Sequence, residues 1–126
     1  MSLRPFLARV ATLVPPPHVS FGAPVSHVGQ RALQRGVVSV PGDVLAWAIS
    51  EAQGRGWSDC IEFVFDICPE SAVYRILLPE GPFYPVIRCG DQLRTIFTQD
   101  QIRAMRRVRR LTKRRAGRRV RRDVSQ

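Results

Sequence analysis

Residues 60–97, CIEFVFDICPESAVYRILLPEGPFYPVIRCGDQLRTIF, decide the fold of this 126-residue chain. β-branched and aromatic residues fill four short runs, CIEFVFDI, AVYRILL, FYPVIR and QLRTIF. The segments between them, PES, PEGP and CGDQ, are typical of turns. The stretch therefore predicts three or four antiparallel strands in a meander.

Two helices are predicted before this sheet. Residues 28–37, VGQRALQRGV, have the composition of a short helix that ends at Gly36, because glycine tolerates the positive φ of a C-cap. In residues 39–56, Val44, Trp47 and Ala48 recur at the spacing of a buried helical stripe. Residues 18–28 predict a short strand or an extended arm, and the segment before them predicts a short helix or arm.

A third helix is predicted after the sheet. Thr98 and Gln101 match the S/T-x-x-E/Q capping box. The next residues place one apolar side chain on each turn, so the helix can dock on the domain; these are Ile102, Met105, Val108 and Leu111. The order predicts an α+β fold, with two N-terminal helices packed on a 3–4 stranded antiparallel sheet and a basic C-terminal helix or tail. The expected divisions are an arm at 1–17, a core domain at 18–102 and an Arg-rich tail at 103–126.

The formal net charge of +10 at pH 7 is confined to that tail. Residues 1–102 carry eight arginines against nine acidic residues, a sum of −1. Residues 103–126 carry eleven arginines and one lysine against one aspartate, a sum of +11. A block of one charge is usually solvated or neutralised by a polyanion, so nucleic acid or an anionic membrane is the expected class of partner.

Nucleic acid is favoured over a membrane. No apolar run approaches the roughly 20 residues that cross a bilayer, and the apolar side of the last helix is too small for a membrane-surface helix. Arginine suits phosphate because its planar guanidinium donates two parallel hydrogen bonds. The residues expected to contact nucleic acid are Arg103, Arg106, Arg107, Arg109, Arg110, Lys113, Arg114, Arg115, Arg118 and Arg119.

The cysteines and histidines do not predict a metal site. Cys60, Cys68 and Cys89 are an odd number without metal-ligand spacing, and His18 and His27 do not complete a zinc set. No metal or cofactor is therefore expected. The cysteines are interpreted as reduced thiols, mostly buried in strands.

Two segments resemble a known superfamily. Residues 26–49, SHVGQRALQRGVVSVPGDVLAWAI, have the form His, three residues, Arg, three residues, Arg-Gly-Val, and then a helix with Asp-Val at its start. Residues 73–102 resemble the end of the same domain, with a strand reading Tyr-x-Val-x-Arg, a Gly-Asp turn and a closing strand. Together they resemble the small bacterial and phage RNase toxins that include barnase, EndoU, certain colicins and RelE-like toxins. The resemblance covers about residues 25–103.

The resemblance implies metal-independent cleavage of RNA, in which the ribose 2′-hydroxyl attacks the adjacent phosphate. Such a reaction needs groups that move protons and cations that stabilise the developing negative charge. By position, His27 would be the general acid or base, and Arg31 would hold phosphate. The same residues also fit a helix-capping histidine and an arginine on a solvated helix face.

The resemblance implies further site residues on the strands. Arg75, Arg88 and Thr95 would converge from three strands on one side of the sheet, with Tyr84 nearby to stack on a base. Each could instead be the polar half of an alternating strand.

Three functions remain open. The first is a toxin-like endoribonuclease in the bacterial or host cytoplasm, which would imply an antitoxin partner. The second is a non-catalytic phage or viral protein that binds nucleic acid in packaging, in the virion or in regulation. Among nucleic acids, RNA is the expected partner of the chain ahead of DNA. The third is an inhibitor or decoy of a nucleic-acid enzyme. The first requires His27 and at least two of Arg31, Arg75 and Arg88 to share one accessible cleft.

Overall fold

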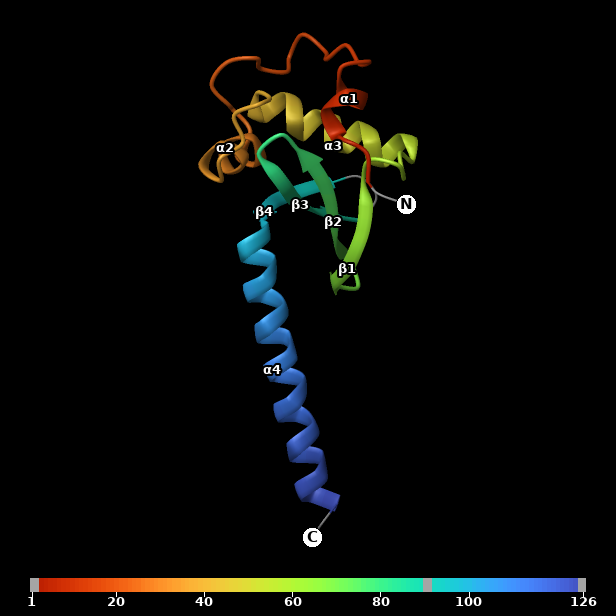
Figure 1. The fold of residues 1–126 in the computed structure, drawn as a ribbon, viewed down its shortest axis with the longest axis vertical. Coiled ribbons are helices and arrows are strands. Elements are labelled where there is room, and N and C mark those ends of the chain that lie inside the picture. The colour runs from red at the N-terminus through yellow and green to blue at the C-terminus, as the bar shows by residue number, and fades with distance from the viewer. Residues whose placement is uncertain (1–2, 90–91, 125–126) are drawn as a thin grey trace.

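The computed structural model describes residues 3–89 and 92–124, with the side chains of the last helix as far as Leu111. Helices and strands follow in the order shown in Figure 1. Their bounds are α1 Phe6–Val10, α2 His27–Gln34, α3 Gly42–Arg55, β1 Glu62–Cys68, β2 Ser71–Leu78, β3 Gly81–Arg88, β4 Gln92–Thr98 and α4 Gln99–Val124. The predicted class, α+β with an antiparallel sheet, is confirmed.

The sheet is a four-stranded meander in the order β1-β2-β3-β4, and every neighbouring pair is antiparallel. Leu78 pairs with Gly81 across a two-residue turn. Gly81 has a backbone φ of 131°, which residues other than glycine rarely adopt. Between β3 and β4, Val86 pairs with Thr95 but Ile87 pairs with Leu93, so one extra residue, Arg94, forms a bulge.

The core lies between the sheet and the three N-terminal helices, which gather on one face in Figure 1. Alternation along a strand sends every second side chain to this face, among them Ile76 of β2, Phe83 of β3 and Ile96 of β4. They meet Leu45 and Ile49 of α3, which are both almost fully buried. The residues between them on the strands point to the opposite face.

The opposite face of the sheet carries a smaller apolar cluster that receives the first turn of α4. Val73, Tyr84 and Val86 pack there with Ile102 of α4, whose exposed fraction is 2%. Thr98 and Gln101 form the predicted capping box, with the Gln101 N–H donating to Thr98 Oγ1 over 3.3 Å and the Thr98 N–H donating to Gln101 Oε1 over 2.9 Å. α4 then continues away from the body as one long helix (Figure 1).

α2 and α3 cross closely at their N-terminal ends. A Cβ atom on Gly42 would overlap the backbone of Gly29, and a Cβ atom on Gly29 would overlap the side chain of Asp43. Glycine at both positions therefore permits the approach. Ser26 caps α2 by accepting a hydrogen bond from the Gly29 N–H, over 3.0 Å.

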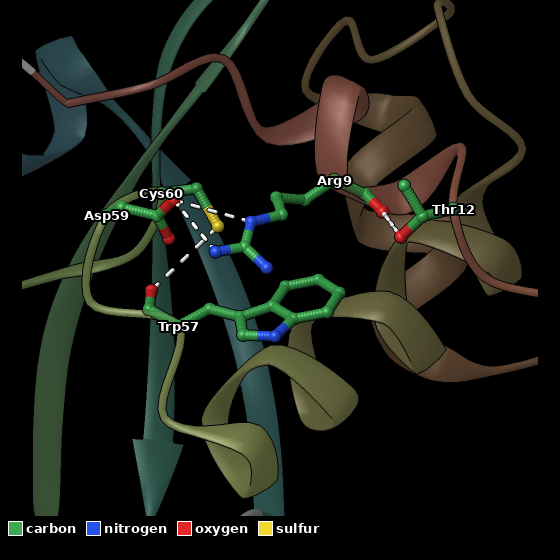
Figure 2. Close-up of polar contacts among 5 residues, drawn as sticks. All are labelled: Arg9, Thr12, Trp57, Asp59 and Cys60. Carbon is green, nitrogen blue, oxygen red and sulfur yellow. Dashed lines mark hydrogen bonds and ion pairs between the residues drawn. The ribbon is translucent and has the colours of Figure 1, made fainter.

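α1 belongs to the core although it was expected to be part of an arm. Phe6 is fully buried among the core residues, and Pro5 forms a bridge with Leu77 of β2. Figure 2 shows how Arg9 holds the helix: its Nη2 donates to Asp59 over 2.9 Å, and its guanidinium lies 5.0 Å from the centre of the Trp57 ring. This hydrogen bond from Arg9 is the largest influence on Asp59 and lowers the pKa of its carboxyl.

Two expectations are corrected by the structure. Only Cys60 is buried, and burial is the main reason that the pKa of its thiol rises to about 11. Cys68 and Cys89 are exposed, because the first ends β1 at a tight turn and the second follows the last residue of β3. Of the short strand and the extended arm predicted for residues 18–28, the strand is not formed: a turn and bends lead to α2 at His27, because Gly22 and Pro24 interrupt the pattern.

Candidate functional site

The predicted catalytic residues on α2 lie on its outer surface. His27 is the first residue of the helix and Arg31 follows one turn later, and both are exposed. The Arg31 Nη1 donates a hydrogen bond to Gln34 Oε1, over 3.4 Å. Arg35 of the same motif turns inward: its Nε donates to Gln101 Oε1 over 2.9 Å, and its guanidinium lies 5.6 Å from the centre of the Phe97 ring. Arg35 therefore ties α2 to the start of α4.

Three predicted residues of the strands lie on the other side of the sheet. Thr95 pairs with Val86 and so faces the cluster under α4. Arg75 lies two residues from Val73, on the same face, and its Nε is 3.2 Å from Glu62. Tyr84 is only 7% exposed within that cluster, which leaves its ring no room to stack on a base.

The predicted catalytic constellation is therefore not assembled in the described part of the chain. Arg88 is the one of the five that lines the pocket beside Trp47 of α3, while His27 and Arg31 lie outside that pocket. Arg75 and Thr95 are separated from α2 by the sheet. The side chains do not meet because alternate residues of a strand point to opposite faces of the sheet. α2 lies on one face, whereas Arg75 and Thr95 point to the other.

This pocket opens between α3, the segment before α2, the end of β3 and the start of β4. Its volume is about 830 Å³. Arg88 comes from the end of β3, Arg94 from the bulge of β4, and Trp47 from α3. The full lining comprises His18, Val19, Val25, Ser26, Val28, Asp43, Ala46, Trp47, Ser50, Arg88, Gln92, Leu93 and Arg94.

Asp43 fixes the wall of this pocket. Its carboxylate accepts hydrogen bonds from the backbone N–H groups of Val25, over 2.8 Å, and Ser26, over 3.1 Å, and also from the Ser26 hydroxyl. Desolvation, the largest single influence, would raise the pKa of this buried carboxyl, but the hydrogen bonds together outweigh it and the pKa is lowered. The ionised side chain thus connects the segment before α2 to the first turn of α3.

The sequence patterns do not indicate a site at the pocket residues His18, Trp47 and Arg94. The available signal was Asp43 just after Pro41 and Gly42, where an acid in the first turn of a helix can bind free N–H groups. No pattern in residues 11–26 predicts that the chain folds back and places His18 beside α3.

The second candidate site is the described part of α4. Arg103, Arg106, Arg107, Arg109 and Arg110 are all exposed. The guanidinium groups of Arg106 and Arg109 lie 5.3 and 5.0 Å from the centre of the Phe65 ring of β1, and Arg109 also donates to the Asp66 carbonyl over 2.9 Å. The remaining predicted contacts lie outside the described side chains; they are Lys113, Arg114, Arg115, Arg118 and Arg119.

The apolar stripe of α4 docks over a shorter length than expected. Ile102 is buried and Met105 is half-buried, but Val108 and Leu111 are 62% and 48% exposed. Along this part of α4 the contacts with the sheet pass to the arginines, since Arg106 and Arg109 lie against Phe65 of β1, so Val108 and Leu111 are not buried as Ile102 is.

In residues 3–89 and 92–124, no three histidine, cysteine or acidic side chains lie together as a metal site would require. None of the helices in the same ranges has the length and apolar character to cross a membrane. Comparisons of the chain with protein-family models, with curated proteins and with solved structures found no match.

Proposed function

We propose that the chain is an RNA-binding protein in which α4 binds the phosphate backbone. The observation that carries this proposal is the row of exposed arginines on α4, held at its base by the buried Ile102. Since residues 1–102 sum to −1 and residues 103–126 to +11, attraction to a polyanion is concentrated on this helix.

The contacts of Arg106 and Arg109 support a binding role. Contact with the Phe65 ring holds both guanidinium groups beside β1, and both residues remain exposed. Two ordered cations lose less side-chain entropy when they bind phosphate than two free side chains would. Arg103, Arg107 and Arg110 extend the positive surface at helical spacing.

RNA is preferred to DNA because residues 25–103 resemble RNase toxins. Cleavage, which that resemblance also implies, requires His27 and its partner arginines in one cleft, and their positions on different surfaces favour binding without cutting. A packaging or regulatory role in a phage or virus fits such a protein.

The test compares two doubly substituted full-length proteins of equal net charge. Arg107→Gln/Arg110→Gln removes two α4 cations, and Arg4→Gln/Arg55→Gln removes two exposed arginines of the body. With a labelled single-stranded RNA, the α4 pair should weaken binding and lower the slope of log affinity against log salt by about 1.4. The control pair should leave both nearly unchanged. Equal effects of the two pairs would contradict the role of α4.

The same RNA, incubated with the protein in EDTA and analysed for a 2′,3′-cyclic phosphate, separates binding from cutting. We expect intact RNA. Cleavage that disappears in His27→Ala would instead establish the endoribonuclease.

A further inference from the structure

The pocket beside α3 combines an aromatic ring with more arginines than acidic residues. Trp47 lines its α3 wall, and Arg88, Arg94 and His18 line the wall made by the strand ends and the segment before α2. A volume of about 830 Å³ lies within the range of small-molecule sites, and the remaining walls are mainly valine, alanine and leucine side chains.

The charges around the pocket favour an anion. Asp43 is the only acidic residue in the described lining, and hydrogen bonds from Val25 and Ser26 already occupy its carboxylate. Arg88 pairs with Glu70 through Nη2, over 3.1 Å. Its Nε and Nη1 form no ion pair within the described part of the chain and can donate to a ligand. Arg94 is exposed and forms no ion pair with any residue in the described part of the chain.

Strand alternation explains why Arg94 is available here. Arg94 lies two residues from Ile96, on the face of the core, while its neighbour Thr95 faces the opposite cluster. The bulge between the Val86–Thr95 and Ile87–Leu93 pairs keeps Leu93 on the same side, so both Leu93 and Arg94 line the pocket. Arg88 and Arg94 thus approach one pocket from adjacent strands.

We infer that this pocket binds one unpaired nucleotide of an RNA strand, with its base against Trp47 and its phosphate against Arg88 and Arg94. Base stacking on an aromatic side chain is the common way in which proteins hold single-stranded bases, and guanidinium groups bind phosphate through paired hydrogen bonds. The inference rests on the proposed RNA binding for the identity of the strand, but the pocket's chemistry can be tested without RNA.

The pocket and α4 are separate sites. The pocket includes Gln92, the first residue of β4, whereas α4 begins at Gln99, directly after the last residue of that strand. Seven extended residues span roughly 23 Å, so a mononucleotide in the pocket does not reach the α4 arginines. A strand of several nucleotides is needed to occupy both.

Tryptophan fluorescence provides the first measurement. The chain has two tryptophans, and Trp57→Phe leaves Trp47 as the only reporter. In this full-length background, uridine 5′-monophosphate should quench the emission of Trp47, while uridine and inorganic phosphate at the same concentration should do so weakly. Absence of mononucleotide binding, checked by calorimetry with the unsubstituted protein, would overturn the inference even if α4 binds RNA.

Paired variants locate the binding. Arg88→Gln/Arg94→Gln should weaken mononucleotide binding at least about tenfold, since each substitution removes a charged hydrogen-bond donor. Arg4→Gln/Arg55→Gln, with the same charge change, should have little effect, and so should Arg107→Gln/Arg110→Gln. Equal affinity of the pocket pair and the control pair would overturn the assignment.

A short RNA distinguishes a nucleotide in a strand from a free nucleotide. If the pocket holds part of the strand, Arg88→Gln/Arg94→Gln should weaken both mononucleotide and RNA binding. Loss of mononucleotide binding with unchanged RNA affinity would contradict the strand as occupant and identify a free nucleotide as the ligand. Loss of RNA binding only in the α4 pair, without any mononucleotide binding, would retain the proposed function and reject this inference.

Discussion

At the scale of single residues, Asp43 links stability to pH. Its carboxyl has a lowered pKa in the folded protein, so the unfolded chain binds the proton more tightly. The stabilisation is fully present above the ordinary aspartate pKa of about 3.9 and is lost as the pH falls through the lower folded value. Asp43→Asn should reduce the free energy of unfolding at neutral pH by about 1–3 kcal/mol, because the amide keeps one oxygen acceptor and its nitrogen cannot accept the other of the two N–H hydrogen bonds from Val25 and Ser26.

The measurement is urea unfolding of both proteins at neutral pH and at about pH 3, below the ordinary aspartate pKa. The difference between wild type and Asp43→Asn should shrink in acid. Asp66→Asn is the control, since this carboxylate is exposed and makes no side-chain hydrogen bond within the described residues. A difference that stays constant with pH would show that the ionised carboxylate of Asp43 is not what stabilises the fold.

At the scale of elements, the crossing of α2 and α3 depends on Gly42. This glycine is needed for its small size and not for a positive φ. Gly42→Ala should cost about 1–3 kcal/mol of unfolding free energy, because the new methyl group would overlap the backbone of Gly29. Gly54→Ala in the same helix has open space around the added carbon and should stabilise by about 0.5–1 kcal/mol. Chemical denaturation measures both, and shifts of the same sign would contradict the packing explanation.

The positions of the strands and of α3 could be predicted from the sequence. The four strands lie close to the predicted runs because PES, PEGP and CGDQ carry turn residues, and α3 ends beside Gly56, whose φ is 69°. It was harder to predict which side chains lie on the same face of the sheet. Whether Arg75 and Arg94 share a face depends on strand alternation, on pairing register and on the bulge in β4, none of which a local pattern of residues specifies.

Placements in the segment before α2 were the least predictable. His18 reaches the pocket from a segment without hydrophobic periodicity, and Phe6 enters the core from a segment that resembled an arm. Both placements depend on contacts distant in sequence, such as the ion pair of Arg9 with Asp59. The basic tail is different, because its charge is visible in composition alone.

At the scale of the whole molecule, charge and shape are divided between two parts, and this division predicts two different responses to salt. If six to eight of the C-terminal cations meet phosphates, log affinity for single-stranded RNA should fall with log salt at a slope of about −4 to −6. A mononucleotide in the pocket meets two arginines and should give a much shallower slope. Fluorescence anisotropy with a short RNA and calorimetry with the mononucleotide, both across about 50–200 mM salt, measure the two slopes. An RNA slope as shallow as that of the mononucleotide would mean that the pocket, rather than α4, holds the strand, because release of counterions scales with the number of phosphates neutralised.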